Sequence, residues 1–250
     1  MKLSVVLITL NEAARLAATL ESVAWADEII VLDAGSTDAT VEIARSYAGH
    51  VAVNADWQGF GVQKNRALDM ATGDWVLSLD ADERVSPELA AEIRAELHNP
   101  QADVYALPRL SSYLGREMRH GGWWPDEVVR LFKRGTARFS PDVVHERLLY
   151  AGTPARLNQV LRHESFNSLE QVLDKVNRYS SAGAEKLAAQ GRKAGLGAAV
   201  GRALWMFLRT YIFKAGFLDG REGFMLAVSN AEGVYYRYLK LMLLNERTGK

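Results

Sequence analysis

The stretch "VLSLDADERV" (76–85) decides the fold, because an apolar run leads directly into three acidic side chains. The run is typical of a buried strand, and Asp80, Asp82 and Glu83 follow where that strand would end. Clustered carboxylates at a sheet edge need something that compensates their negative charge, and a divalent cation is the first candidate. We therefore predict a sheet whose edge carries an acidic, metal-binding site.

Short apolar strands alternate with amphipathic helices through the first hundred residues. We expect strands at 3–9, 28–34, 50–54 and 74–81, followed by helices at 12–23, 38–47, 60–71 and 87–97. This alternation predicts an α/β fold, with a mostly parallel sheet flanked by helices. Ligands bind beyond the carboxyl ends of the strands in such sheets. Residues 9–12, Asp33, Asp80 and Asp82 all fall at that edge.

The pattern changes after residue 103. Residues 103–163 are typical of antiparallel or irregular strands, and the chain after Ser168 is typical of helices in three segments. We divide the chain into a catalytic domain, 1–165, and a helical C-terminal region, 166–250. We interpret that region as a contact with a membrane surface or with another subunit.

Composition narrows the class of protein. The chain has 250 residues, of which 48% are hydrophobic and 24% charged, as in ordinary folded proteins. It has no cysteine, which excludes disulfides, thiol catalysis and thiolate zinc sites. The N-terminal apolar run lacks a small-residue cleavage site, so we interpret it as the first strand.

Charge is unevenly distributed along the chain. Residues 1–155 hold 15 Lys and Arg against 22 Asp and Glu, whereas residues 156–250 hold 15 against 8. The excess of acid indicates a metal-dependent or cationic site in the first part, and the excess of base indicates an anionic surface as partner of the second. Solvated helix faces are the alternative interpretation.

Five motifs occur in a characteristic order. They are "VVLITLNE" (5–12), "VLDAGSTDAT" (31–40), "GFGVQKNRALDMATGDWVLSLDADE" (59–83), "GGWWPDEVVRLFKRG" (121–135) and "VVHERL" (143–148). Together they resemble the family-2 glycosyltransferases of GT-A fold, and within them the bacterial subgroup related to the glucosyltransferases of the lipopolysaccharide inner core. The resemblance covers nearly the whole chain.

The resemblance implies roles for the residues of the donor site. Glu12 and Asp33 would border the nucleotide, and Lys64 would line its pocket, unless Lys64 lies on the exposed face of its helix. Asp80 would lie near the ribose and the metal. Asp82 would bind the metal, Mg²⁺ or Mn²⁺, which bridges the diphosphate.

Further candidates come from the second half of the resemblance. His145 would be a third metal ligand or a diphosphate contact, with a surface His–Glu pair as the alternative. Trp123 and Trp124 would form a platform for the acceptor sugar or pack in the core. Arg130 would pair with phosphate or simply flank a strand.

The general base is expected to be Asp126. Inverting transfer needs a carboxylate that takes the proton of the acceptor hydroxyl. Family members commonly place this base in a Glu-Asp pair, and "WWPDE" puts Asp126 at the matching position, with Pro125 where the acid would be. Glu146 is the competing candidate.

The function implied is an inverting, metal-dependent transfer of a sugar, with glucose expected, from a UDP-sugar to a lipid-linked saccharide. The product would belong to lipopolysaccharide core or another cell-envelope glycan, and no nucleic-acid partner is expected. A sugar-phosphate nucleotidyltransferase is disfavoured by the glycine-free loop "LNEAARL" (10–16). A non-catalytic membrane-binding scaffold of the same fold is disfavoured by the intact acidic residues.

The segment "GRALWMFLRTYIFKAGFLDG" (201–220) predicts a peripheral membrane contact. Charges interrupt its apolar run too often for a transmembrane span. Arg202 and Arg209 fall on nearly one helical face, as in helices that lie on an anionic bilayer. We therefore expect a cytoplasmic protein that binds the inner face of the cytoplasmic membrane, with packing on the catalytic domain or on another subunit as the alternative.

Overall fold

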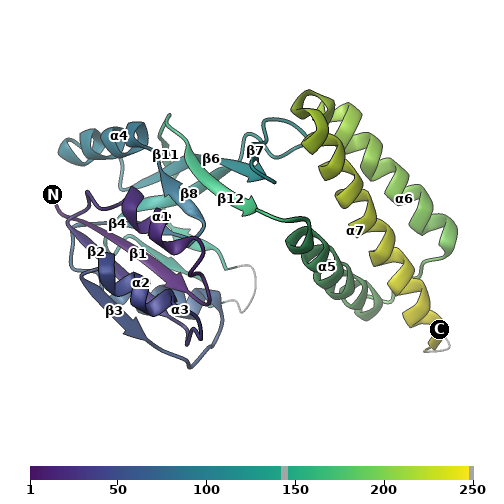
Figure 1. Ribbon diagram of the computed structural model, residues 1–250, viewed down its shortest axis with the longest axis horizontal. Coiled ribbons are helices and arrows are strands. Elements are labelled where there is room, and N and C mark those ends of the chain that lie inside the picture. Colours follow the sequence, from purple (N-terminus) through teal and green to yellow (C-terminus); the bar gives the residue numbers. More distant parts are fainter. Residues whose placement is uncertain (142–145, 248–250) are drawn as a thin grey trace. The chain divides into compact units, whose positions relative to one another are not determined.

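A computed structural model describes residues 1–141 and 146–247 of the chain (Figure 1). The chain forms two compact units. Unit 1 comprises Met1–Arg109 and Asp126–His163, and unit 2 comprises Leu110–Pro125 and Glu164–Lys250.

The sheet has the strand order β3-β2-β1-β4-β8-β6-β12-β5, with β7 and β11 paired to β6. The strands of its parallel part are β1 (Leu3–Thr9), β2 (Glu28–Asp33), β3 (His50–Val53) and β4 (Trp75–Leu79). The others are β5 (Glu83–Val85), β6 (Val104–Tyr113), β7 (Arg116–Glu117), β8 (Glu127–Lys133), β11 (Ala155–Arg156) and β12 (Leu161–Phe166). Because β8 is antiparallel to both β4 and β6, the sheet is mixed. The predicted α/β fold is confirmed.

Helices and a small hairpin cover the two faces of the sheet. The helices of unit 1 are α1 (Leu16–Ser22), α2 (Thr40–Tyr47), α3 (Phe60–Asp69) and α4 (Pro87–His98), and the hairpin consists of β9 (Ala137–Phe139) and β10 (Leu148–Tyr150). One core cluster joins α1, α2 and α4 to the sheet through Val5 and Val31, and the other joins α3 and β9 to it through Val6 and Ile30. Successive strand residues thus point to opposite faces, so both faces of β1, β2 and β4 are buried.

The register of the parallel strands places their carboxyl ends at one edge. Strand β1 lies between β2 and β4, with Thr9 opposite Asp33 and Leu7 opposite Leu79. The loops that follow these three strands therefore start side by side. This edge is where we expected the functional residues of unit 1.

Unit 2 is built around three helices that lie alongside one another (Figure 1). They are α5 (Leu169–Ala189), α6 (Leu196–Leu208) and α7 (Gly220–Arg247), and between α6 and α7 come a π-helical turn η1 (Arg209–Phe213) and a 3₁₀ turn η2 (Gly216–Asp219). The Ser168 hydroxyl accepts a hydrogen bond from the Gln171 amide and so caps α5. Among the described residues, none of the helices combines the length and apolar character needed to cross a bilayer.

Candidate active site

Asp33, at the end of β2, holds the loop that follows it. Its carboxylate accepts hydrogen bonds from the Thr9 hydroxyl at 2.9 Å, the Gly35 amide at 2.8 Å and the Ser36 amide at 2.7 Å. The side chain is fully buried, and these contacts compensate its burial. The structure thus gives Asp33 a role in shaping the edge, and its direct contact with a nucleotide stays a prediction.

The loops after β1 and β2 are joined by hydrogen bonds between backbone and side chains. The Asn11 amide donates to the Ser36 hydroxyl and the Glu12 amide to the Thr40 hydroxyl, both at 2.8 Å, while Asn11 Oδ1 accepts from the Thr37 amide at 2.9 Å. These contacts fix the loop after β1 against the loop after β2. This explains why α1 begins only at Leu16, four residues later than expected.

Glu12 lies half-buried at this edge, in a field of negative charge. Burial raises the pKa of its carboxyl group, and the charges of Asp82, Asp38 and Asp80 raise it further, while the charge of Arg15 lowers it. A cation at this edge would relieve the repulsion. The contact of Glu12 with a nucleotide stays a prediction.

Asp80, directly after β4, is compensated by two basic side chains. Its Oδ1 lies 2.9 Å from Lys64 Nζ, and its Oδ2 accepts a hydrogen bond from Arg130 Nη2. Burial alone would raise the pKa of Asp80, but the charges of Arg130 and Lys64 hold it well below its usual range. In the structure Lys64 and Arg130 compensate this charge, and the contact of Asp80 with a metal stays a prediction.

Lys64 is buried on α3 and bridges two carboxylates. Its ammonium group lies 2.9 Å from both Asp80 Oδ1 and Glu146 Oε1. Gly61, one turn earlier, permits this placement, because a Cβ there would lie 1.8 Å from the Ser140 carbonyl oxygen. Lys64 thus does not occupy the exposed helix face that was its alternative placement.

Arg130, on β8, also reaches Glu83, the third acidic residue of the deciding stretch. Arg130 Nη2 donates to Glu83 Oε1 at 2.7 Å, and the Glu83 side chain is fully buried. Burial would lower the pKa of Arg130, but Asp80 and Glu83 raise it. Arg130 is therefore an internal partner of the acidic cluster, and its contact with a phosphate stays a prediction.

Asp82, like Asp80, is a partly exposed carboxylate of this stretch, with 25% of its side chain exposed compared with 34% for Asp80. Its Oδ2 lies 3.5 Å from Arg15 Nη1 and 3.4 Å from His163 Nε2. Neither basic residue was predicted from the sequence, because Arg15 follows β1 and His163 lies on β12, far from Asp82 in the chain. In the sequence, each is recognisable only as a basic residue within or beside an expected helix or strand.

The donor set fits a hard divalent cation that takes most of its ligands from a substrate. Among the described residues, no group of three or more His, Asp or Glu side chains is arranged to hold a metal ion. Mg²⁺ and Mn²⁺ need only one or two protein carboxylates when phosphate oxygens and water complete the shell. Because both oxygens of Asp80 contact basic groups, Asp82 is the carboxylate that would serve.

Asp126 follows the break between the two units and is held by Arg109. Arg109 Nε and Nη2 donate to Asp126 Oδ2 at 2.9 and 2.8 Å, and Arg109 Nη1 reaches Glu83 Oε1 at 3.2 Å. The Asp126 side chain is 39% exposed, compared with 17% for Glu146. Both candidate bases are thus oriented by a cation, and Asp126 is the more accessible.

The remaining predicted site residues do not belong to the described part of unit 1. Trp123 and Trp124 belong to unit 2, where the indole of Trp123 packs against Tyr113 and Phe166. The Trp124 ring lies 5.8 Å from the guanidinium of Arg119. His145 lies outside the described residues.

Comparisons with known proteins show the family of this chain. The family described as Glycosyl transferase family 2 matches residues 4–149. A glycosyltransferase of Rickettsia typhi is 33% identical over 258 residues, which span 98% of this chain and 87% of the relative. The lipopolysaccharide core biosynthesis glycosyltransferase LpsC of Rhizobium meliloti is 29% identical over 257 residues, which span 94% and 93% of the two chains.

A solved structure extends the likeness to the fold. Residues 1–349 of S. aureus TarS, in complex with UDP, superpose with a TM-score of 0.50 at 17% identity, over 100% of this chain and 92% of that chain. At this identity the likeness concerns the fold alone. The strand order, the matched residues and the full-length relatives together place this chain among the family-2 glycosyltransferases, and it is a glycosyltransferase.

Proposed function

We propose that the protein transfers a sugar, with inversion, from a UDP-sugar to a lipid-linked saccharide, with Mg²⁺ or Mn²⁺ as cofactor. Glucose is the expected sugar, and lipopolysaccharide core or another cell-envelope glycan is the expected product. The name of the relative LpsC supports this class of acceptor. The family membership favours sugar transfer over the nucleotidyltransferase and scaffold alternatives.

The observation that carries the proposal is the position of Asp82. It is a partly exposed carboxylate beyond a parallel strand, close to both an arginine and a histidine. A diphosphate needs positive charge around it, and Arg15 would contribute that charge directly. When bound at Asp82, the metal ion would neutralise the negative charge that develops on the departing diphosphate.

Asp126 is the proposed base. The acceptor hydroxyl oxygen bonds to the anomeric carbon as the bond from that carbon to the diphosphate oxygen breaks, and the hydroxyl proton passes to a carboxylate. Both contacts from Arg109 use Asp126 Oδ2, so Oδ1 is the oxygen that would receive the proton. Arg109 would fix the direction of that oxygen, and general-base catalysis contributes about 10²-fold or more.

A transfer assay tests this assignment. Asp126→Asn should retain donor affinity and lose transfer by about 10²-fold or more. Asp69→Asn is the matched control, because Asp69 also forms a paired contact with an arginine, Arg138, on the exposed surface. The reverse ranking of Asp126→Asn and Glu146→Gln would move the base to Glu146.

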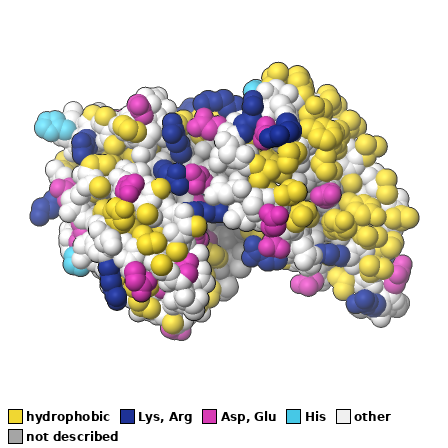
Figure 2. Space-filling view, viewed as in Figure 1, with side chains coloured by type: hydrophobic (Ala, Val, Ile, Leu, Met, Phe, Trp, Pro, Cys, Tyr) yellow, Lys and Arg dark blue, Asp and Glu magenta, His cyan; other side chains and the backbone are white. Residues whose placement is uncertain are grey.

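We also propose that unit 2 binds the surface of an anionic membrane, where a lipid-linked acceptor would be met. Hydrophobic side chains gather over α6 and α7 (Figure 2). Four apolar residues of α6 are exposed at intervals of four and so share one helical face: Leu196, Val200, Leu204 and Leu208. Trp205 and Phe213, whose rings lie 5.5 Å apart, are 56% and 68% exposed.

The basic residues first assigned to this surface have other contacts as well. The Arg202 guanidinium lies 4.7 Å from the Tyr238 ring, and Arg209 lines a cavity of unit 2. The exposed apolar and aromatic side chains therefore support the membrane proposal more directly than these two charges do.

A further inference from the structure

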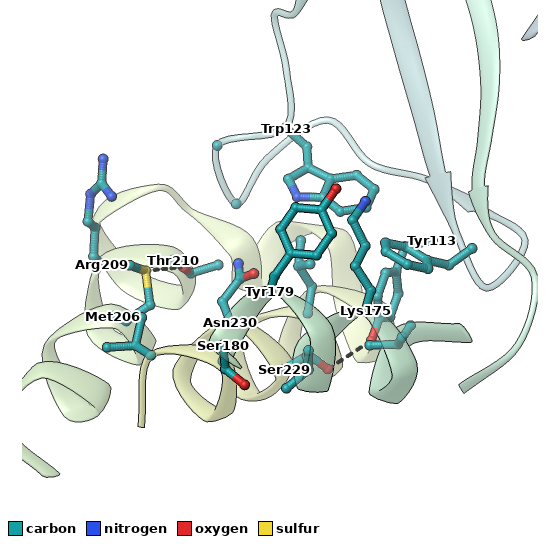
Figure 3. Close-up of a pocket in the computed structure, with 18 of the residues that line it drawn as sticks. Tyr113, Trp123, Lys175, Tyr179, Ser180, Met206, Arg209, Thr210, Ser229 and Asn230 are labelled. Carbon is teal, nitrogen blue, oxygen red and sulfur yellow. Dashed lines mark hydrogen bonds between the residues drawn. The ribbon is translucent and has the colours of Figure 1, made fainter. Parts of the chain in front are cut away.

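Unit 2 contains a cavity that the proposed donor site does not use. It has a volume of about 500 Å³ and is lined by the ends of β6 and β12, by the loop at Gly121–Trp123 and by the helices of the unit (Figure 3). Lys175 and Tyr179 extend from α5 toward Trp123, while Arg209 and Tyr113 lie toward opposite ends of the cavity. A cavity of this size accommodates a small ligand or a head group.

The charge of the lining is strongly one-sided. Four basic side chains contribute to it: Lys175, Arg209, Lys214 and Arg237. Among the lining residues that the structure describes, none is acidic. Within the described residues, no carboxylate forms an ion pair with Arg209, Lys214 or Arg237, and the Arg237 Nε atom is buried without a hydrogen-bond partner. A ligand with negative charge would satisfy these groups.

Aromatic rings form the other part of the wall. Tyr113, Trp123 and Phe166 pack together with ring centroids 5.9 to 6.3 Å apart. Lys175 Nζ lies 4.8 Å from the centre of the Phe166 ring and 5.5 Å from that of Tyr179. Aromatic faces suit the apolar faces of sugar rings, and beside cations they fit a ligand that is both a saccharide and an anion.

Two glycines with positive φ and a π-helical turn shape the backbone around the cavity. Gly121 and Gly122 have φ of +67° and +86°, and a Cβ on Gly121 would lie 3.3 Å from Leu226. The Lys214 amide donates to the Arg209 carbonyl at 2.8 Å, which closes the π-helical turn and places both basic residues at the cavity. Single π-helical turns occur frequently at functional sites.

We propose that this cavity binds the phosphorylated saccharide of the lipid-linked acceptor. The cations would hold the phosphate, with the guanidinium groups of Arg209 and Arg237 suited to its oxygens, and the aromatic wall would hold the sugar ring. Two aromatic residues of the cavity are close in the chain to residues of unit 1. Trp123 precedes Asp126 by three residues, and Phe166 follows His163 by three. The identification of the ligand as the acceptor rests on the proposed function, whereas its chemistry rests on the lining alone.

Calorimetry on the full chain tests the proposal with four probes: glucose 6-phosphate, glucose, inorganic phosphate and vesicles of phosphatidylglycerol. We expect glucose 6-phosphate to bind about tenfold or more tightly than either glucose or inorganic phosphate, because only it engages both parts of the wall. The double variant Arg209→Gln, Arg237→Gln should weaken that binding by about 100-fold, since each lost charged hydrogen bond costs about tenfold.

The matched control is the double variant Arg178→Gln, Arg221→Gln. It removes the same charge from exposed residues of unit 2 that do not line the cavity, and it should leave binding within about twofold. The proposal would be overturned if inorganic phosphate and glucose 6-phosphate bound equally tightly, or if the cavity variant bound glucose 6-phosphate with unchanged affinity. It would also be overturned if the cavity variant weakened the binding of vesicles and of no other probe.

UDP binding in the same preparations, measured with Mn²⁺ present, separates this inference from the proposed function. Asp82→Asn should lose UDP binding and keep glucose 6-phosphate binding. If the wild type binds glucose 6-phosphate, the cavity variant binds it more weakly, and the wild type fails to bind UDP, then the donor assignment fails and the cavity assignment stands. If UDP binds as expected and glucose 6-phosphate does not bind, the cavity assignment fails alone.

Discussion

Replacing Arg130 by glutamine should destabilise unit 1 far more than the loss of an ordinary surface ion pair. Arg130 donates to both Asp80 and Glu83, and its own side chain is buried. The substitution leaves Glu83, which is fully buried, with Arg109 as its remaining ion-pair partner. Asp80 keeps Lys64 at 2.9 Å.

The expected loss follows from these partners. Removing one member of a buried ion pair typically costs 3–5 kcal/mol, roughly, because the other charge is left uncompensated. Each carboxylate here keeps one basic partner, and Asp80 is 34% exposed and partly screened by solvent. We therefore expect the lower end of that range, about 3 kcal/mol, or a melting temperature lower by roughly 6–12 °C for a chain of this size.

Thermal and urea unfolding, followed by circular dichroism, measures this difference. The control is Arg138→Gln, which breaks an ion pair with Asp69 whose side chains are 58% and 59% exposed, and which should cost about 1 kcal/mol or less. The pKa of Asp80 is lowered in the folded state, so its contribution is present above its unfolded pKa of about 3.9 and is lost as the pH falls below that value. Equal losses in the two variants at pH 7 would refute the reasoning.

Two further predictions concern the active-site edge and unit 2. Burial and neighbouring acids raise the pKa of the Glu12 carboxyl group in the folded state. Ionisation of Glu12 therefore lowers the free energy of unfolding as the pH rises from about 4 through the raised pKa. Glu12→Gln should therefore melt at a higher temperature than wild type at pH 7 but not at pH 4, and an identical shift at both values would contradict this. Trp205→Ser with Phe213→Ser should reduce co-sedimentation with anionic vesicles at low salt by about tenfold or more per side chain, from the apolar area lost. The control variant Trp57→Ser with Phe60→Ser removes an exposed aromatic pair from unit 1 and should leave co-sedimentation unchanged. Failure of the wild type to bind the vesicles would contradict the membrane proposal.

Most of the parallel part of the fold was predictable, because β1, β2 and β4 are buried on both faces. Strands of this kind are continuous apolar runs, so β1, β2 and β4 were located closely from residue type alone. The start of α1 was not, because the first residues of the expected helix hydrogen-bond to the loop after β2, and the sequence does not show which loop lies opposite.

The acidic residues of the site were predictable, but their partners were not. Strand ends locate Asp80 and Asp82 at one edge, whereas the side chains that compensate them come from α3, β8, β12 and the loop after β1. Lys64 reaches Asp80 from 16 positions away and Arg130 from 50, so only the register and packing of the sheet bring them together. Periodicity carries no signal for such contacts, and for this reason Arg15 and His163 were missed.

The most direct test of the central claim is a calorimetric titration of UDP-glucose into wild type and Asp82→Asn, each with and without Mn²⁺. We expect the wild type to bind UDP-glucose when Mn²⁺ is present. Binding should be lost without the metal and in the Asp82→Asn variant, because the negative charge of the diphosphate would then meet the negative charge of the edge without a cation between them. Asp69→Asn should bind as wild type does. An unchanged affinity of Asp82→Asn for UDP-glucose, with and without Mn²⁺, would remove the "DADE" residues from the donor site and contradict the account.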